Sequence, residues 1–170
     1  MLDAYAEGTI CKINCDAMKK DVVVLGLGNP LMSDEGVGCH IIEQFLAQSE
    51  KYPSVDFIDA GTSGIAILHY LANRRKAILV DCAYMGAKAG TIKRFTPDEV
   101  NSTKKLAHES LHQVDVLKII DLAKQLNQCP QQLIIFGIEP ESIKPESQLS
   151  KTVTAKIDYY IAAISKDLAL

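Results

Sequence analysis

The chain has 170 residues, which is enough for one domain with a substantial core but short for two. Apolar residues make up 48% and charged residues 23%, as in ordinary globular proteins, and the net charge of −3 argues against nucleic-acid and anionic-membrane partners. No apolar run approaches the ~20 residues of a membrane-spanning helix, and Lys19 and Lys20 follow the weakly apolar first segment, unlike in a secretory signal. The five cysteines are odd in number, so these features together predict a cytoplasmic protein.

The first 17 residues do not share the pattern of the rest. Met18 stands directly before two lysines and the first apolar run, as at an ordinary protein start. We therefore expect residues 1–17 to be an extension and residues 18–170 to form a single α/β domain. Cys11 and Cys15 would share one face of a helix, but two cysteines lack the remaining ligands of a zinc site.

In the first half of the chain, apolar runs alternate with helical spacing. The β-branched run over residues 22–27 predicts a buried parallel strand, and a helix is expected over about residues 36–48. Residues 55–58 predict a second short strand. After a Gly-rich turn at residues 61–64 we expect another helix, with three residues on its inner face: Ile65, Leu68 and Leu71. Residues 77–80 predict a third buried strand.

The second half continues this alternation. Residues 91–95 predict an edge strand because two basic residues lie in it. A helix is expected over residues 113–126 and the last strand over residues 133–138. Apolar residues three and four apart, bordered by Tyr160, predict one C-terminal helix; they are Leu149, Val153, Ile157, Ile161, Ile164 and Leu168. The order of elements indicates an α/β fold with three layers, a mainly parallel twisted sheet of about five strands with helices on both faces.

The most informative segment is the turn after the first strand, residues 26–38, which read GLGNPLMSDEGVG. Its glycines let the backbone leave the strand tightly. Asp34 and Glu35 precede a helix, whose N-terminus favours ionised carboxylates that can bind a cation. Asp34 or Ser33 would cap this helix. We expect capping for Asp34 and metal binding for Glu35.

Two further ligand types are expected close to Glu35. Asp81 follows the third strand, and open α/β sheets bind ligands at the carboxyl ends of their strands, although an Asp there also forms turns and caps. His112 comes just before the predicted helix. One imidazole and two carboxylates suit a borderline divalent ion such as nickel or zinc and leave a position open for water or substrate. Asp59, at a neighbouring strand end, would either orient a ligand from behind or stabilise the turn at Gly61.

The pattern Gly-x-Gly-Asn-x-Leu-x-x-Asp-Glu-Gly-x-Gly over residues 26–38 resembles the opening motif of the hydrogenase maturation endopeptidases. Other segments match that family in the same order along the chain. They are residues 59–62 (DAGT), the apolar strand ending at Asp81, residues 110–113 (SLHQ) and residues 137–143 (GIEPESI). The resemblance extends from about Val22 to the C-terminal helix.

The resemblance implies a metal-dependent endopeptidase that removes the C-terminal extension of a nickel-iron hydrogenase large-subunit precursor after nickel insertion. Carried over by position, the family's metal ligands, which are also its catalytic residues, are Glu35, Asp81 and His112, with no separate Ser or Cys nucleophile. The implied cofactor is nickel, held by the enzyme or supplied by the substrate, with zinc or cadmium able to substitute. The implied partner is the precursor, with no nucleic acid and no membrane.

Three alternatives fit parts of the sequence. A dinucleotide-binding module would use Gly26 and Gly28, but Leu31 stands where its fingerprint needs a third glycine, and the acidic pair would repel pyrophosphate. A peptidyl-tRNA hydrolase has a similar GLGNP opening, but no Arg-His-Asn follows and the chain lacks a basic RNA-binding face. A non-catalytic chaperone that holds the metal-loaded precursor is the third, and turnover of precursor separates it from a protease.

Two other sets of residues are weaker candidates. His108 and His112 are four residues apart and would share one face of a helix, offering a two-His site. Cys82 adjoins Asp81 but would need an adjacent base to act as a nucleophile. The loops over residues 83–90 and 96–109 are expected to contact the precursor and to set the choice of isoenzyme.

Overall fold

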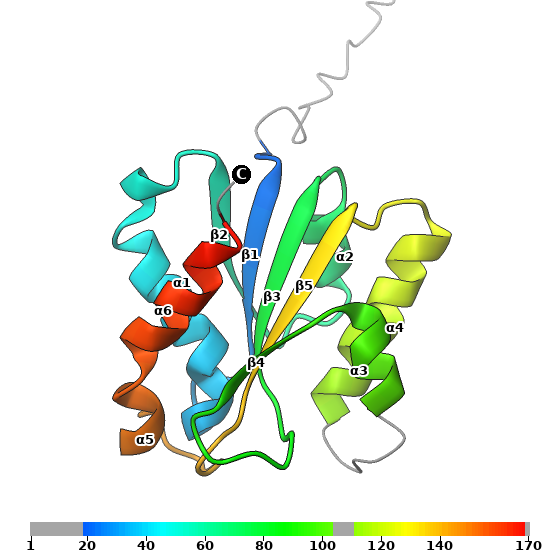
Figure 1. Cartoon of the computed structure of the whole chain (residues 1–170). Helices are drawn as coiled ribbons and strands as arrows, with labels where there is room; N and C mark the ends of the chain where they lie inside the picture. The colour runs from blue at the N-terminus through cyan, green and yellow to red at the C-terminus, as the bar shows by residue number, and fades with distance from the viewer. Residues whose placement is uncertain (1–18, 104–110, 169–170) are drawn as a thin grey trace, which may run out of the picture.

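The structure, a computed structural model, describes residues 19–103 and 111–168, with side chains for residues 19–100 and 116–168. These residues form a five-stranded sheet in the order β2-β1-β3-β5-β4, with helices on both faces (Figure 1). The strands are β1 (Val22–Leu27), β2 (Val55–Gly61), β3 (Lys76–Cys82), β4 (Ile92–Phe95) and β5 (Gln132–Ile138). All neighbours are parallel except β4, which runs antiparallel to β5 at the edge. The predicted fold class and edge strand are confirmed.

Helices follow the strands as the alternation predicts. The longer ones are α1 (Val37–Leu46), α2 (Ala66–Leu71), α3 (Pro97–Thr103), α4 (Leu111–Gln125) and α6 (Ile157–Lys166). The short ones are α5 (Lys151–Thr154) and the 3-10 turns η2 (Ser33–Gly36) and η3 (Ser49–Lys51). None of the described helices is both long enough and apolar enough to cross a membrane. The predicted extension with Cys11 and Cys15, and also His108, lies outside the described residues.

The sheet separates two apolar cores because successive strand side chains point to opposite faces. In β1, Val22 and Val24 pack with α1, α5 and α6 on one face, whereas Val23 and Leu25 pack with α2 and α4 on the other. Both sets are fully buried, with exposed fractions of 0–1%. This explains the continuous apolar runs that predicted buried parallel strands.

The connections fix where the chain can bind a ligand. α1 joins β1 to β2 across one face of the sheet, and α2 joins β2 to β3 across the other (Figure 1). The loops after β1 and β3 therefore diverge, and the crevice between such loops is where open α/β sheets bind ligands. Glu35 lies in the loop after β1, and Asp81 lies at the end of β3.

Three local features differ from the sequence-based expectation. α3 falls in a segment predicted to be a loop; Thr96 begins it, Pro97 takes the first helical position, and the Glu99 carboxylate accepts a hydrogen bond from the Thr96 N–H at 2.7 Å. Ile65 is 69% exposed because α2 begins after it and turns Ile67 inward instead. The single C-terminal helix is in fact α5 and α6, separated by a turn at residues 155–156.

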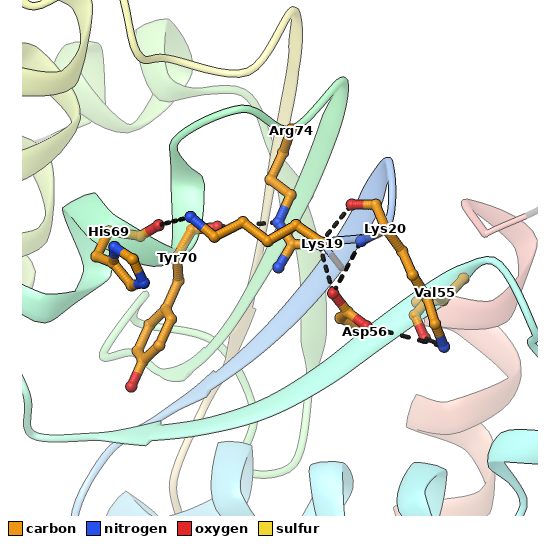
Figure 2. A network of polar contacts seen from close by, with 7 residues as sticks. All are labelled: Lys19, Lys20, Val55, Asp56, His69, Tyr70 and Arg74. Atoms are coloured by element: carbon orange, nitrogen blue, oxygen red, sulfur yellow. Dashed lines mark hydrogen bonds and ion pairs between the residues drawn. The ribbon is translucent and has the colours of Figure 1, made fainter. Parts of the chain in front are cut away.

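A polar network closes the amino-terminal edge of the sheet, opposite the switch point (Figure 2). The guanidinium of Arg74, whose side chain is 2% exposed, contacts Asp56 at 2.5 Å and also donates to the Lys20 carbonyl. The Lys20 N–H donates to the same Asp56 carboxylate at 3.1 Å, and its ammonium donates to the Val55 carbonyl at 3.0 Å. The network therefore ties the start of β1 to β2 and to the turn before β3.

Two glycines let α1 approach the sheet closely. A Cβ atom on Gly38 would lie 2.4 Å from the carbonyl oxygens of both Leu27 and Val80, and one on Gly26 would lie 2.4 Å from the Gly38 oxygen. These atoms belong to backbone, which cannot move aside without displacing the helix or a strand. The N-terminal end of α1, and with it η2, can therefore sit beside the ends of β1 and β3 only with glycine at these positions.

We expect Gly38→Ala to destabilise the fold by roughly 2 kcal/mol or more and to lower Tm by about 4–8 °C, because its methyl group collides with two strand carbonyls. Gly64→Ala is the matched control, since nothing lies within 4 Å of the Cβ it would add. Thermal unfolding followed by circular dichroism measures both variants. Equal Tm values for the two variants would contradict the close-approach argument.

Candidate functional site

Asp81 is the buried acid at the switch point. Asp81 lies at the carboxyl end of β3 and is 9% exposed. Burial raises the pKa of the Asp81 carboxyl to about 7, opposed by a hydrogen bond from the Cys82 backbone and reinforced by the charge of Glu35. A carboxylate held this way is costly to ionise unless a cation compensates it.

Glu35 lies in η2, directly before α1, and is half-buried. Because its charge acts on Asp81, the structure brings together two of the three predicted ligands from segments far apart in the sequence. The loop that carries Glu35 leaves β1 at Gly28, whose N–H donates to the Gly61 carbonyl at 3.0 Å. This hydrogen bond holds the ends of β1 and β2 together where the loop that carries Glu35 begins.

A small cavity of about 50 Å³ lies against Asp81. It is lined by the loops after β1 and β2 and by α2 and α4, through Leu27, Gly28, Gly61, Thr62, Gly64, Ile67, Val116 and Ile119. A larger hollow of about 640 Å³ lies elsewhere, between α1 and residues 147–157, and contains none of the predicted ligands. The small cavity is therefore the better candidate site because the buried acid opens into it.

His112 is the second residue of α4, and its side chain lies outside the described part of the structure. Its backbone position is one helical turn before Val116, which lines the Asp81 cavity. Among the described side chains, which exclude His112, no group of three or more His, Cys, Asp or Glu residues is arranged to hold a metal ion. The pair of Glu35 and Asp81 is the part of the predicted triad that the structure describes.

The predicted capping role of Asp34 is wrong, since neither η2 nor α1 has a side-chain cap from Asp34 or Ser33. Instead the Asp34 carboxylate is fully buried and accepts three backbone hydrogen bonds from the segment after β5. The donors are Glu141 at 2.8 Å, Ser142 at 3.1 Å and Ser150 at 2.7 Å. The Ser33 N–H also donates to the Glu146 carbonyl at 2.6 Å. Asp34 thus fastens the turn that carries Glu35 to a distant loop.

Glu139 has a similar role that the sequence analysis missed. It lies 6% exposed just beyond β5, and its carboxylate accepts hydrogen bonds from the N–H groups of Met85 at 2.7 Å and Ala87 at 3.1 Å. It thereby orders the loop that follows Asp81 and Cys82. The available signal was its position at the carboxyl end of an apolar strand, the same signal that singled out Asp81.

Asp59 takes the turn-stabilising role that was one of its two predicted alternatives. Its carboxylate accepts a hydrogen bond from the Gly61 N–H at 2.9 Å. It also lies beside Cys39, where burial and then a hydrogen bond to Asp59 raise the pKa of the Cys39 thiol to about 12. Cys39 is therefore a neutral core residue.

Cys82 is also unsuited to nucleophilic attack. It is 8% exposed, and burial, followed by the charges of Asp81, Asp34, Glu35 and Glu139, raises the pKa of its thiol far above the ordinary range. Burial and then the charges of Cys82, Glu139, Asp34 and Glu35 raise the pKa of Tyr84. No basic side chain in the described part of the chain forms an ion pair with Asp34, Asp81 or Glu139. This oxygen-rich, acidic edge suits a divalent cation.

The comparison of this sequence with protein families agrees with the motif analysis. The profile of the family described as hydrogenase maturation protease matches residues 39–167. The hydrogenase 2 maturation protease of Escherichia coli is 33% identical over 141 residues, 81% of this chain and 84% of that protein. The hydrogenase expression/formation protein HupD of Bradyrhizobium diazoefficiens is 33% identical over 119 residues, and the match spans 62% of its length.

Solved structures agree with these matches. The hydrogenase maturating endopeptidase HybD from E. coli superposes with a TM-score of 0.73 at 28% identity, over 86% of this chain and 91% of that chain. The solution structure of an endopeptidase from E. coli gives a TM-score of 0.72 at 30% identity, over 84% of this chain and 88% of that chain. The segment that matches the family profile, residues 39–167, contains Asp59, Asp81 and His112 and begins just after Glu35. This chain belongs to the hydrogenase maturation protease family.

Proposed function

We propose that this protein is a cytoplasmic endopeptidase that removes the C-terminal extension from a nickel-loaded nickel-iron hydrogenase large-subunit precursor. The observation that carries the proposal is the buried Asp81 carboxyl beside Glu35 at the switch point of the sheet. Family membership supports the reaction class, and the acidic edge supports a cationic ligand. Asp81, Glu35 and His112 would bind nickel, with zinc or cadmium able to take its place.

Each residue of the site would have a separate role in the reaction. When bound, the ion would polarise the scissile carbonyl or lower the pKa of an attacking water. Asp81 lies at the end of a sheet strand and is buried, so its side chain has a fixed position from which it would supply one oxygen ligand. Glu35 supplies the second oxygen from η2, and His112 the nitrogen from the first turn of α4. Asp59 would orient this loop region through the Gly61 turn.

Asp34 and Glu139 would hold the loops that surround the site. Asp34 joins η2 to residues 141–150, and Glu139 joins β5 to the loop after Asp81. Both are acids whose oxygens are occupied by backbone N–H donors, so they are unavailable as ligands in the described arrangement. A substrate that must be cut at one bond needs such a rigid frame, because small displacements of the reacting groups are costly.

Mass spectrometry of large-subunit precursor incubated with this protein tests the function directly. We expect a short C-terminal peptide to be lost from nickel-loaded precursor only, and His112→Ala to slow this cleavage by at least about 100-fold by removing a ligand. His69→Ala is the matched control, because His69 is exposed on α2. Tight binding of precursor without cleavage would favour the non-catalytic chaperone instead.

Removing the Asp81 charge should stabilise the metal-free fold while abolishing cleavage. The pKa of Asp81 is raised in the folded state to about 7, so its contribution to stability is complete below its ordinary value of 3.8 and is lost as the pH rises through about 7. At pH 8 in chelator, Asp81→Asn should therefore be more stable than the unmodified protein by on the order of 3 kcal/mol. At pH 4 the two should unfold together.

Differential scanning calorimetry at the two pH values measures this difference. The control is Asp121→Asn, an exposed acid on α4, which should follow the unmodified protein at both. Nickel should raise the Tm of the unmodified protein and not that of Asp81→Asn. A destabilised Asp81→Asn protein at pH 8 would show that the carboxylate is held by favourable contacts and would contradict the argument.

Asp34→Asn should loosen the frame, because an amide cannot accept all three backbone hydrogen bonds that the carboxylate accepts. We expect a loss of about 1–3 kcal/mol in the free energy of unfolding. Hydrogen exchange should quicken at the amides of Glu141, Ser142 and Ser150, with a lower kcat for precursor. Asp121→Asn again serves as control. Unchanged exchange at these amides would mean that Asp34 does not hold the loop.

A further inference from the structure

The loop between β3 and β4, residues 83–91, is longer than the connection requires. β5 lies between these two strands, and β4 begins at the carboxyl edge, so the loop crosses the end of one strand (Figure 1). Two strand spacings come to roughly 10 Å, whereas an extended loop of this length reaches about 30 Å. The connection alone therefore does not fix the path of the loop, which begins two residues after Asp81.

The end of β5 holds this loop from one side. The Ala83 N–H donates to the Ile138 carbonyl at 2.9 Å, and the Gly90 N–H donates to the Glu139 carbonyl at 2.8 Å. Between these two points, the Glu139 carboxylate accepts the two backbone hydrogen bonds described above. These contacts use the N–H groups of the loop and leave the Gly90 carbonyl to be satisfied by another part of the chain.

The start of α6 supplies two donors to that carbonyl. The Tyr160 hydroxyl donates to the Gly90 oxygen at 2.9 Å, and the Lys156 ammonium donates to the same oxygen at 3.0 Å. The ammonium also donates to the Ala89 carbonyl at 3.5 Å. Lys156 is the N-cap residue of α6 and Tyr160 follows it by four residues, so both side chains lie on one face of the helix.

The backbone at Gly90 is suited to this contact. Gly90 is buried with φ of +72°, and a Cβ atom there would lie 3.1 Å from the Lys156 Cδ and Nζ atoms and from the Tyr160 hydroxyl. Burial and then the charge of Asp34 raise the pKa of Tyr160 to about 12, so its hydroxyl keeps its proton and donates. Tyr160 is fully buried, and a buried hydroxyl is costly without a partner. The Gly90 carbonyl provides that partner.

The loop held in this way turns other residues outward beside the proposed site. Tyr84 is 49% exposed, Lys88 is exposed, and the charges of Glu139 and Glu35 act on the Tyr84 hydroxyl. Asp81 is fixed separately, because it lies in β3, which pairs with β5 as far as Cys82. A change at Gly90 would therefore displace the outer side chains of the loop and leave the proposed ligand in place.

We propose that Lys156 and Tyr160 are positioning residues for cleavage, holding the loop after Asp81 in the conformation in which its exposed side chains contact the precursor. This inference rests on the proposed function and adds two residues of the C-terminal segment to it. Neither residue touches the reacting groups, since both act through the Gly90 carbonyl. A loop that has lost these contacts must be ordered when the precursor binds, which weakens binding and raises KM. The value of kcat depends on Asp81 and is retained.

A double variant with Lys156→Met and Tyr160→Phe removes both donors but keeps the aliphatic chain and the ring. The matched control combines Lys151→Met with Tyr159→Phe, which makes the same changes at exposed positions on α5 and α6. Mass spectrometry of nickel-loaded precursor gives KM and kcat for each protein. Circular dichroism establishes that both variants are folded at the assay temperature.

Hydrogen exchange, followed by NMR without precursor, reports on the loop itself. We expect the amides of Met85, Ala87 and Gly90 to exchange roughly tenfold faster in the Lys156→Met, Tyr160→Phe protein. The KM for precursor should rise roughly tenfold while kcat stays within about twofold. The control should match the unmodified protein in all three measurements.

Two single substitutions complete the test. Lys156→Arg should leave KM unchanged, because a guanidinium still donates to the Gly90 carbonyl. If the double variant does not fold, Lys156→Met alone should raise KM by a smaller factor, since Lys156 is only half-buried and its loss leaves the Tyr160 hydrogen bond.

The outcomes separate this inference from the proposed function. Equal KM values for the double variant and its control, with cleavage by the unmodified protein, would overturn only the positioning role. A fall in kcat at unchanged KM would also overturn it, because the two residues would then act on the fold or the chemistry instead of the loop. Failure of the unmodified protein to cleave any nickel-loaded precursor would overturn the proposed function and this role with it.

Discussion

The close approach of α1 to the sheet is the constraint on which the site depends. Gly26 and Gly38 leave no room for a Cβ atom between the helix and the backbone of β1 and β3. Helices normally pack on sheets through layers of side chains, so this contact brings the start of α1 unusually near to the strand ends. Glu35 immediately precedes that start. The position of Glu35, the first proposed ligand, is therefore set by a packing contact made by residues that have no side chain.

The acids at the carboxyl edge of the sheet fall into two groups according to whether backbone hydrogen bonds compensate their charge. Asp34 and Glu139 are buried, yet five backbone N–H donors approach their oxygens, so the charge is compensated within the fold. Asp81 is also buried, but its single backbone hydrogen bond does not offset the effect of burial, and its pKa rises. The first group builds the frame and the second is left in need of a cation. Buried acids thus provide rigidity in one case and a proposed metal ligand in the other.

The sequence predicted what depends on short-range pattern. β-branched runs gave the buried strands, and the order of elements placed Glu35 and Asp81 at one edge before any contact was known. Contacts between distant segments could not be predicted in this way. Asp34 accepts hydrogen bonds from N–H groups 107 to 116 residues away, and the Tyr160 hydroxyl donates to the Gly90 carbonyl, 70 residues away. Asp34 was consequently assigned to a local cap, and Tyr160, fully buried, was placed at the border of its helix. α3 could have been predicted, because residues 96–99 have the capping-box sequence Thr-x-x-Glu with proline at the first helical position, and the Glu99 carboxylate does accept from the Thr96 N–H.

Ion pairs that stabilise the fold lie at one edge of the sheet, and the proposed site lies at the other. At the amino-terminal edge, charged groups are paired: Arg74 meets Asp56, and Arg94 makes a bidentate contact with Asp167 at 3.0 and 3.2 Å. At the opposite edge, Asp34, Asp81 and Glu139 form no ion pair with a described basic side chain, and large apolar side chains face solvent. Both arrangements lower the stability of an isolated chain, since like charges repel and exposed apolar groups are hydrated unfavourably. They persist where a ligand and a substrate would relieve them, so the unfavourable features of the fold coincide with the proposed site.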